Sequence, residues 1–507
     1  MESGKRIVII GSGIGGLICG AILAKEGYVI TVLEMNKQIG GNLQTYARDK
    51  HVFDSGVHYI GGLEKGQNLF KIFKYLDIMD KLRMEKLDEN AFDKIVFGSD
   101  NKEYKYAQGY DTFSKSLIAD FPEEEQAIEK YCQTIRDICD KFPLYNLRQG
   151  DFMEKSIYLE IDTKTFICSI TNNTRLQNVL GGNNPLYAGI GDKTPLYVHA
   201  LVLNSYIESS YRLINGGSQI AKLLTRIILA NGGSVKNKTE IKKLSVDNHG
   251  LVEYAEAADG SRYEADHFIS NIHPAKTLSL TDSEVIRMAY RNRINNLENS
   301  ISAFILNVTL KPNMFKYVNT NYYCYLEDDV WECSSHTDDS WPLFYAMFYS
   351  GMPKDTQYAE GITIMGYMKF EEVEKWKDTF NTVGYPNSRG EEYEAFKKRK
   401  AEKLLDVVEQ KFPGLKNAIK NYYTSTPLTF RDYMGTDDGS IYGIAKDYKE
   451  PLKTFISPRT KIKNLLLTGQ NINLHGILGV SISSLVTCSV LLGMDEIIKK
   501  VDDAQID

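Results

Sequence analysis

The chain has 507 residues, of which 43% are hydrophobic and 25% charged, and its 60 basic and 66 acidic residues give a net charge of −6. This length and apolar content are typical of a globular protein with more than one domain and a sizeable core. The slight acidic excess excludes the basic surface that nucleic acids need, so we expect no nucleic-acid partner.

The start of the chain favours a cytoplasmic protein. The first predicted strand follows Met1 so closely that no signal peptide fits before it, and no uncharged apolar run is long enough to span a membrane. The seven cysteines are odd in number, scattered and without a C-x-x-C pair. We therefore expect buried free thiols rather than disulfides, and no metal site.

The segment from Lys5 to Gly41 predicts a βαβ unit. The β-branched apolar run Arg6–Ile10 is typical of a buried parallel strand, and apolar residues at helical spacing follow Gly16. A second apolar run at Val29–Leu33 predicts the next strand. The two strands and the helix between them predict a parallel sheet.

The turn of this unit carries a G-x-G-x-x-G pattern. Gly11 permits a tight turn, Gly13 lets the backbone approach a pyrophosphate, and Gly16 allows the helix to pack on the strand. Glu34 ends the second strand, where a carboxylate accepts ribose hydroxyls and repels a 2′-phosphate. The unit predicts dinucleotide binding rather than a merely structural turn, with phosphate contacts at the helix start that include Ile14 and Gly15.

A second glycine-rich stretch follows a predicted strand pair within 45–53. It comprises Gly40-Gly41 and the string FD-x-G-x-HYIG at Phe53–Gly61. With the first motif and its acid, it resembles the flavoprotein superfamily that includes amine oxidases and phytoene desaturases. HYIG is most similar to the retinol saturase and carotenoid isomerase branch.

This resemblance implies an FAD cofactor. Gly40, Gly41, Asn42 and Gly56 would then belong to the cofactor site. Gln38 and Asn42 stand where the family often has arginines, so phosphate contacts there are either weaker or made by the backbone.

The middle of the chain predicts two kinds of structure. Residues from about 75 to 205 show helical periodicity, and Ser218–Ala230 predicts a further helix. Strands are expected at 240–246, 251–257 and 267–271. By resemblance, the strand with Ile241 would pass the adenine, and the strand at 267–271 would return to the central sheet.

From about 275 to 455 the pattern is one of alternating strands, such as Ser302–Leu310 and 362–369, which predicts an antiparallel sheet. A helix is expected at Glu391–Phe412. Its basic run, Lys397–Lys400, is interpreted as a solvated face, with peripheral contact to an anionic membrane as the alternative.

The last segment predicts a buried strand at 464–468 and then an apolar helix starting near Gly479-Val480. LLLTGQN and HG-x-x-G resemble the carboxy-terminal flavin motif of the same branch. Gly469 and Gln470 would contact the cofactor, and the helix would direct its N-terminus at the flavin. Asn471 replaces an acid of the family pattern, and an amide can both donate and accept.

Three residues are candidates for catalysis. By resemblance, His58 lies beside the flavin and has an unperturbed pKa suited to proton donation, with positioning of its loop as the alternative. His475 is either catalytic or a packed or capping residue, and Tyr59 lines the substrate cavity or fills the core. His199 lies in an apolar periodic segment and is expected to be an interior histidine.

The predicted fold is α/β, with a discontinuous Rossmann-like FAD-binding domain and an inserted α+β substrate domain that contains an antiparallel sheet. The FAD-binding domain comprises 1–75, 205–275 and 455–507, and the substrate domain comprises 76–204 and 276–454. The resemblance implies an oxidoreductase that saturates, desaturates or isomerises carbon–carbon double bonds of a hydrophobic polyene or isoprenoid. The alternatives are an amine oxidase-like enzyme and a flavin-containing lipid carrier. The oligomeric state is not predicted.

Overall fold

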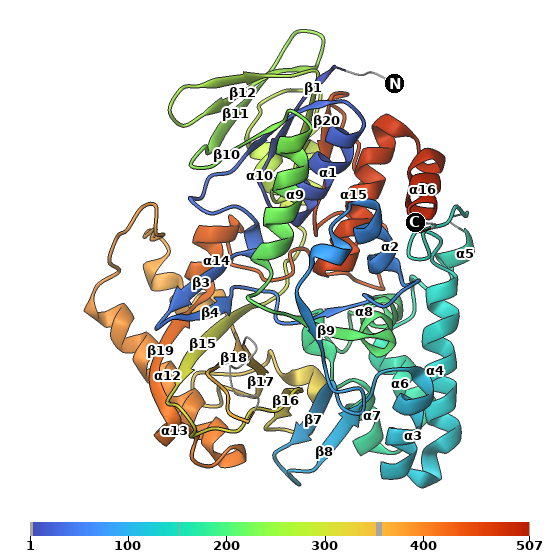
Figure 1. Ribbon diagram of the computed structural model, residues 1–507, viewed down its shortest axis with the longest axis vertical. Coiled ribbons are helices and arrows are strands. Elements are labelled where there is room, and N and C mark those ends of the chain that lie inside the picture. Colours follow the sequence, from blue (N-terminus) through green and yellow to red (C-terminus); the bar gives the residue numbers. More distant parts are fainter. Residues whose placement is uncertain (1–3, 152, 351–356, 506–507) are drawn as a thin grey trace.

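The computed structural model describes residues 4–151, 153–350 and 357–505. Its central sheet has five parallel strands in the order β10-β2-β1-β14-β20 (Figure 1). Their bounds are β1 Arg6–Ile10, β2 Val29–Leu33, β10 Ser234–Lys236, β14 His267–Ser270 and β20 Leu465–Leu467. The predicted βαβ unit and the return of 267–271 to the central sheet are confirmed.

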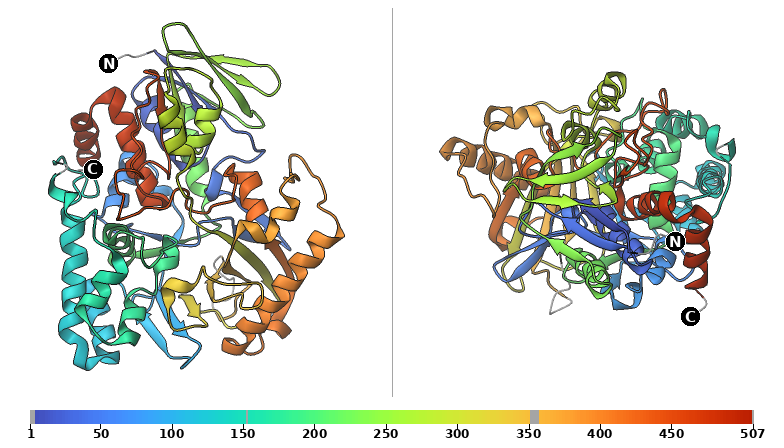
Figure 2. Two further views of the ribbon diagram at one scale, coloured as in Figure 1. Left: turned by 180° about the vertical axis from the view of Figure 1, so that it is seen from behind. Right: turned by 90° about the horizontal axis from the view of Figure 1, so that it is seen from above.

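Helices cover one face of this sheet. They are α1 (Ile14–Lys25), α9 (Ser218–Ala230) and α15 (Gly476–Leu492), and the last packs with α1 although it is far away in sequence (Figure 2). A Cβ on Gly20 of α1 would lie 2.8 Å from Ile228 Cδ1, so the glycine lets α9 approach closely. The other face packs on the antiparallel strands β11 (Ile241–Val246), β12 (Val252–Ala257) and β13 (Arg262–Glu264).

The second large sheet has seven strands in the order β19-β15-β18-β17-β16-β7-β8. The bounds are β7 Asp93–Phe97, β8 Glu103–Tyr106, β15 Ser302–Leu310, β16 Asn321–Tyr325, β17 Phe344–Tyr349, β18 Gly361–Met368 and β19 Ile419–Ser425. The expected antiparallel sheet is confirmed except at one pair, because β16 and β7 run parallel.

The expectation of a helical segment at 75–205 needs correction. The segment contributes β7 and β8 to the large sheet and β6 (Met84–Lys86) to a three-stranded sheet with β5 (Ile60–Gly61) and β9 (Ser210–Leu213). Periodicity within the segment did not reveal these strands, because β7 is held by backbone hydrogen bonds to β16, which lies far away in the sequence. The hairpin of β3 (Thr45–Arg48) and β4 (His51–Asp54) agrees with the expected strand pair.

The helices of this segment form the wall at the right of Figure 1. They are α3 Tyr110–Asp120, α4 Glu125–Asp140, α5 Met153–Ser156, α6 Thr163–Ile170, α7 Thr174–Leu180 and α8 Leu196–Glu208. Helix α2 (Asn68–Tyr75) precedes the segment and packs on α15 and α16. The remaining helices are α10 Pro274–Ser279, α11 Met288–Asn295, α12 Glu391–Lys411, α13 Leu415–Ala418, α14 Pro427–Met434 and α16 Met494–Asp503.

Two expectations about buried side chains can be compared directly with the structure. His199 is fully buried, and its two ring nitrogens bond the hydroxyls of Tyr131 (2.6 Å) and Tyr187 (2.7 Å), which confirms an interior histidine. The cysteines are free, and six of them are buried, but Cys168 is exposed.

The basic run on α12 is not entirely a solvated face. Lys400 is buried, and its ammonium group pairs with Glu372 (2.5 Å) and Asp338 (2.8 Å) and lies over the ring of Trp341. It therefore holds α12 against the sheet and is unavailable to a membrane. Across the described parts of the chain, no helix combines the length and apolar character that crossing a bilayer requires.

Asn464 provides a test of how the sheets are joined. Its side chain bonds both the N–H (2.8 Å) and the C=O (2.9 Å) of Val252, which ties β12 to the segment entering β20. We expect Asn464→Ala to lower the free energy of unfolding by about 1–3 kcal/mol for each backbone group left unsatisfied. Urea denaturation measures this. Asn237→Ala, which removes a bond on the surface, should change stability by less than about 0.5 kcal/mol; equal midpoints for the two variants would contradict the assignment.

Candidate functional site

The glycine turn after β1 is closely packed. Gly11 has a φ of +92°, and a Cβ on Gly16 would lie 2.3 Å from the Gly11 carbonyl oxygen. The start of α1 has no side-chain cap at Gly13, so its first N–H groups are free to meet an anion. Gly41 approaches the same turn, because a Cβ there would lie 3.1 Å from Gly13 Cα.

The carboxylate of Glu34 is fixed beside this turn. It accepts hydrogen bonds from the Ser12 N–H (3.0 Å), the Ser12 hydroxyl (2.6 Å) and the Asn36 N–H (2.8 Å). The Ser12 hydroxyl also accepts a bond from the Gly40 N–H (3.0 Å). A buried acceptor held by three donors is a rigid, preorganised ligand.

The opposite side of the turn is formed by Asn271 and Gly469, which follow β14 and β20. A Cβ on Gly13 would lie 2.7 Å from Asn271 Nδ2, and one on Gly469 would lie 2.7 Å from Asn271 Oδ1. Asn271 thus lies between the two glycine loops and sets how closely they approach. The sequence interpretation did not select Asn271 or Ser12.

Asn471, where the resemblance expects an acid, has a structural partner. Its Oδ1 accepts a hydrogen bond from the Ile444 N–H (2.9 Å), and a Cβ on Gly443 would lie 2.2 Å from the same oxygen. The amide oxygen therefore holds the 443–444 loop against the start of the carboxy-terminal segment. Neighbouring Gln470 lines the cavity with Asn471.

The expected helix start near Gly479-Val480 is one turn too late. The helix α15 begins at Gly476, because the backbone turns at Gly476 with a φ of +71°. Gly479 lies inside the first turns, where a Cβ would lie 2.7 Å from Leu474 Cβ. It serves packing, whereas Val480 faces the cavity.

One cavity joins most of the predicted residues. Its lining includes Gly11, Gly13, Ile14, Gly15, Glu34, Gly40, Gly41, Asn42, Gly56, His58, Tyr59, Ile241, Gly469, Gln470, Asn471 and Val480. Three predicted residues, Gly16, Gly479 and His475, do not line it. The cavity continues between apolar side chains of the large sheet and α14, among them Ile305, Phe348, Met365 and Phe430.

The ring of His58 stacks on Phe348, with centroids 4.4 Å apart and planes 9° from parallel. Burial lowers the pKa of His58 to about 4, and the charge of Arg212 acts in the same direction. The imidazole is therefore neutral at pH 7.

His475 precedes α15. Its Nε2 bonds the Leu186 carbonyl oxygen (3.1 Å), and its ring packs on Tyr442 at 4.5 Å. Burial lowers the pKa of His475 to about 4. This ring joins the α15 start to the 184–186 loop.

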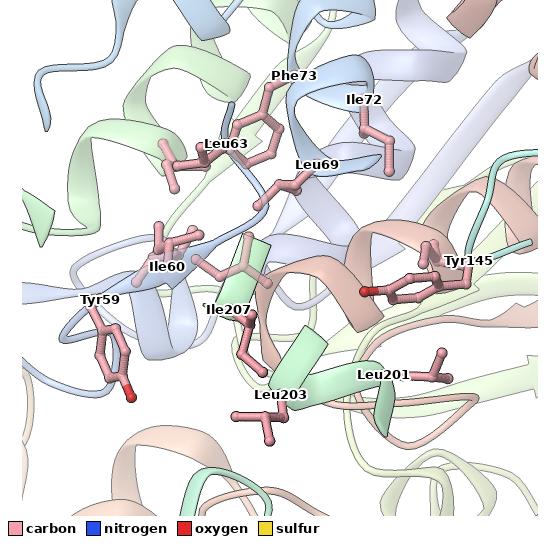
Figure 3. Packing of buried hydrophobic residues seen from close by; sticks show 14 of the residues in the cluster. Tyr59, Ile60, Leu63, Leu69, Ile72, Phe73, Tyr145, Leu201, Leu203 and Ile207 are labelled. Atoms are coloured by element: carbon pink, nitrogen blue, oxygen red, sulfur yellow. The ribbon is translucent and has the colours of Figure 1, made fainter. Parts of the chain in front are cut away.

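Tyr59 ends in a buried polar cluster. Its hydroxyl donates to Asp93 Oδ2 (2.7 Å) and lies 2.7 Å from the Tyr323 hydroxyl. Figure 3 shows this hydroxyl pointing away from Ile60 and Leu63, which belong to the apolar cluster behind it. Both tyrosines line the cavity, and Asp93 lies behind them.

Asp93 and Tyr323 carry no local sequence signal. Asp93 occupies the first position of β7, where a single acid before an apolar run is typical of a strand boundary. Its hydrogen-bond partners come from segments around 59, 183 and 321. Only knowledge of which distant segments contact each other would have indicated the cluster, and a single sequence does not provide it.

The comparisons with known proteins agree with this geometry. Residues 9–76 match the family model described as an NAD(P)-binding Rossmann-like domain. The rat all-trans-retinol 13,14-reductase is 26% identical to this chain, with 96% of this chain and 85% of the relative covered. The chloroplastic prolycopene isomerase of Arabidopsis thaliana is 25% identical, with 87% and 74% covered. These homologues confirm the resemblance to the retinol saturase and carotenoid isomerase branch.

A solved structure confirms the fold. The oxidoreductase from Methanosarcina mazei superposes with a TM-score of 0.62 at 16% identity, over 95% of this chain and 99% of that one. The Rossmann-like domain and the α/β architecture with antiparallel sheets are thus shared over nearly the whole length.

His58 provides a test of the burial at this site. The unfolded chain binds a proton at His58 near its ordinary pKa of 6.5, whereas the folded protein binds one only near 4. Stability should therefore fall as the pH drops between these values, by about 1.4 kcal/mol per pH unit for one proton. Urea denaturation at several pH values should show a shallower slope for His58→Gln than for the exposed control His249→Gln. Equal slopes would contradict the assignment.

Proposed function

We propose that this protein is an FAD-dependent oxidoreductase that acts on carbon–carbon double bonds of a hydrophobic polyene or isoprenoid. The observation that carries the proposal is one cavity that joins the glycine turn and Glu34 to an apolar wall containing Phe348 and Met365. The names of the homologues, a retinol reductase and a carotene-type isomerase, support this substrate class.

The residues present fit an extended dinucleotide. Gly13, Ile14 and Gly15 line the cavity at the start of α1, where backbone N–H groups would meet a pyrophosphate. Glu34 offers a carboxylate for the ribose hydroxyls, and Ile241 lines the cavity on the side expected for the adenine. A site for NAD alone would need no second glycine loop and helix start at 469–476.

The second loop supports FAD in particular. Gly469 has a φ of +99°, and Gln470 and Asn471 follow it in the cavity wall. These residues and the start of α15 would hold the flavin half, with Asn42 and Gly56 from the amino-terminal segment. When bound, FAD would supply hydride exchange with a substrate carbon.

The protein would bind and orient the polyene with apolar contacts and exclude water from it. We propose that residues 1–75, 205–275 and 455–507 form the FAD-binding domain. Residues 76–204 and 276–454 would form the substrate domain. For His58 the neutral, stacked ring supports positioning of its loop, and for His475 the bond to Leu186 supports a packing role. Tyr59 would reach the substrate side of the cavity.

Two alternatives have distinct requirements. An amine oxidase-like enzyme needs an aromatic pair facing the flavin and a small polar cavity, whereas the far wall here contains the apolar side chains of Ile305 and Met365. A lipid carrier would bind flavin and polyene without turnover, and anaerobic reduction followed by reoxidation with a polyene distinguishes it from an enzyme.

The FAD assignment can be tested with Glu34. Because hydrogen bonds to charged groups contribute about 1.5–3 kcal/mol, Glu34→Ala should weaken FAD binding about 10- to 100-fold in calorimetric titration. Ser12→Ala keeps the carboxylate but removes one of its supports, and we expect a smaller loss in the same direction. The exposed control Glu253→Gln should bind as the wild type does. Unchanged affinity for both site variants would refute the placement of the ribose.

The reaction is tested with the products. FAD-loaded, reduced protein is incubated anaerobically with retinoids, carotenoids and unsaturated lipids, and products are identified by mass. A gain of two hydrogens identifies saturation. With oxidised flavin, a loss of two hydrogens identifies desaturation, and an equal mass with a shifted retention time identifies isomerisation. A protein that binds FAD but yields none of these products is the carrier rather than the enzyme.

A further inference from the structure

We propose that Asp93, Tyr59 and Tyr323 form a proton wire that delivers a proton from the protein interior to the double bond of the substrate, which makes saturation the favoured reaction. The proposal rests on the proposed function and adds the source of the proton. Tyr323 would be the catalytic donor, and Asp93 would act on the substrate only through the two tyrosines.

The geometry of the chain is continuous. Asp93 Oδ2 lies 2.7 Å from the Tyr59 hydroxyl, which lies 2.7 Å from the Tyr323 hydroxyl. Both distances are those of strong O–H···O bonds. The exposed fractions are 0% for Asp93, 5% for Tyr59 and 1% for Tyr323, so bulk water does not compete for these hydrogen bonds.

The two hydroxyls and the carboxyl group can share their protons in two hydrogen-bonding arrangements. When Asp93 is ionised, Tyr59 donates to it and Tyr323 donates to Tyr59, so no proton is directed at the cavity. When Asp93 is protonated, it donates to Tyr59, Tyr59 donates to Tyr323, and the Tyr323 proton is released toward the cavity that its ring lines. Each hydroxyl has one proton, so the arrangements exclude each other. The protonation of Asp93 thus decides whether the cavity faces a proton donor.

Two amides hold the carboxyl in place. Asn321 Nδ2 donates to Asp93 Oδ1 (2.9 Å) and Asn183 Nδ2 donates to Asp93 Oδ2 (2.6 Å). Arg212 is joined to the cluster through Asn321, whose Oδ1 accepts from the guanidinium at 3.2 Å. The oxygen of the Asn183 amide is buried with no hydrogen-bond partner among the described residues. This unsatisfied group indicates that the amide is kept for its donation to Asp93.

The titration of Asp93 fits a proton reservoir. Burial raises the pKa of Asp93 to about 7, against the hydrogen bonds from Asn321, Tyr59 and Asn183 and the charge of Arg212. Burial also raises the pKa of Tyr59 and of Tyr323 well above the ordinary value, so neither persists as a tyrosinate. A proton that leaves Tyr323 must therefore be replaced from Asp93.

The other groups that face Asp93 do not compete for this role. Tyr106 and Tyr206 interact with its charge, and burial raises the pKa of both phenols, so they stay neutral. Tyr106 donates its proton to the Val179 carbonyl. Arg212 donates its N–H groups to Tyr317, Asn319 and Asn321 rather than to Asp93 or to the two tyrosines of the wire.

Saturation breaks the π bond of one double bond and forms two C–H bonds, one with a hydride and its electron pair and one with a proton. A bound reduced flavin would supply the hydride and its electron pair. Tyr323 gives the proton to the other carbon and takes one from Tyr59, and Tyr59 takes one from Asp93. Asp93 ends as a carboxylate and regains its proton through Tyr59 and Tyr323, which line the cavity, once the product has left and water enters.

The reservoir can be tested without cofactor or substrate. Infrared difference spectra of the folded protein between about pH 5 and 9 should show a protonated carboxyl band that disappears with a midpoint near 7 and is absent in Asp93→Asn. Asp54 is a second buried carboxyl whose pKa burial raises to about 7, so Asp54→Asn identifies its band separately. Tyr59→Phe should shift the Asp93 band, because it removes a hydrogen-bond partner. If no band responds to Asp93→Asn, the reservoir assignment is wrong.

The wire is tested on the saturation reaction with the FAD-loaded protein. In the wild type, kcat should fall as the pH rises through about 7, because protonated Asp93 is lost. Asp93→Asn, Tyr59→Phe and Tyr323→Phe should lower kcat about 10²- to 10⁴-fold with little change in KM, and Asp93→Asn should abolish this pH dependence. Tyr367→Phe is the matched control, since its buried hydroxyl has no partner in the described structure and does not line the cavity; it should keep both rate and pH profile.

The outcomes separate the two hypotheses. A wild-type protein that converts no polyene refutes the proposed function. The infrared titration then still tests whether Asp93 holds a proton that it loses near pH 7. A wild-type protein that saturates its substrate with unchanged rate in Asp93→Asn or Tyr323→Phe overturns the wire. An increase confined to KM in Tyr323→Phe would instead show that the Tyr323 hydroxyl recognises a polar end of the substrate. That result would also overturn the proton wire.

Discussion

The site depends on the parallel pairing of β1 with both of its neighbours. Because β2 and β14 run in the same direction as β1, their carboxyl ends meet at one edge of the sheet. The turn at Gly11, the carboxylate of Glu34 and the amide of Asn271 therefore lie together, although they come from distant segments. The turn leaves no space for side chains at Gly13 or Gly16, so backbone N–H groups face the cavity.

The far end of the cavity depends on a different pairing. Parallel alignment of β7 with β16 places Asp93 opposite Asn321 in register and brings Tyr323 toward the same layer. A buried carboxyl is costly unless its oxygens are hydrogen-bonded, and here two amides and a phenol supply the bonds. Burial disfavours the ionised form of Asp93 and the hydrogen bonds favour it, so the pKa of this carboxyl lies at about 7.

The two ends supply complementary chemistry within one cavity. The glycine edge offers N–H donors and a fixed carboxylate for a dinucleotide, and the sheet offers apolar contacts and a hydroxyl chain. Asp93, Tyr59 and Tyr323 are buried, and hydrogen bonds and charges act strongly where the local dielectric is low. A hydride donor on one side and a proton source on the other are the two components that saturation of a double bond needs.

The sequence by itself determined the local units. Arg6–Ile10, the glycine spacing and Glu34 specify a βαβ unit because each signal lies within a few residues of the next. The strands predicted at 302–310 and 362–369 also follow from their own patterns, and the structure places them at 302–310 and 361–368. The carboxy-terminal loop was found, but the start of α15 was placed a turn late, since Gly476 and Gly479 are both plausible helix starts in sequence. Only the tertiary structure decided the positions of Asn271, Asp93, Tyr323 and Lys400. The neighbours of Asn271, Asp93 and Tyr323 are brought together by the pairing of strands that are far apart in the sequence, and those of Lys400 by the packing of α12 against residues 338–341 and Glu372. No local pattern records such contacts.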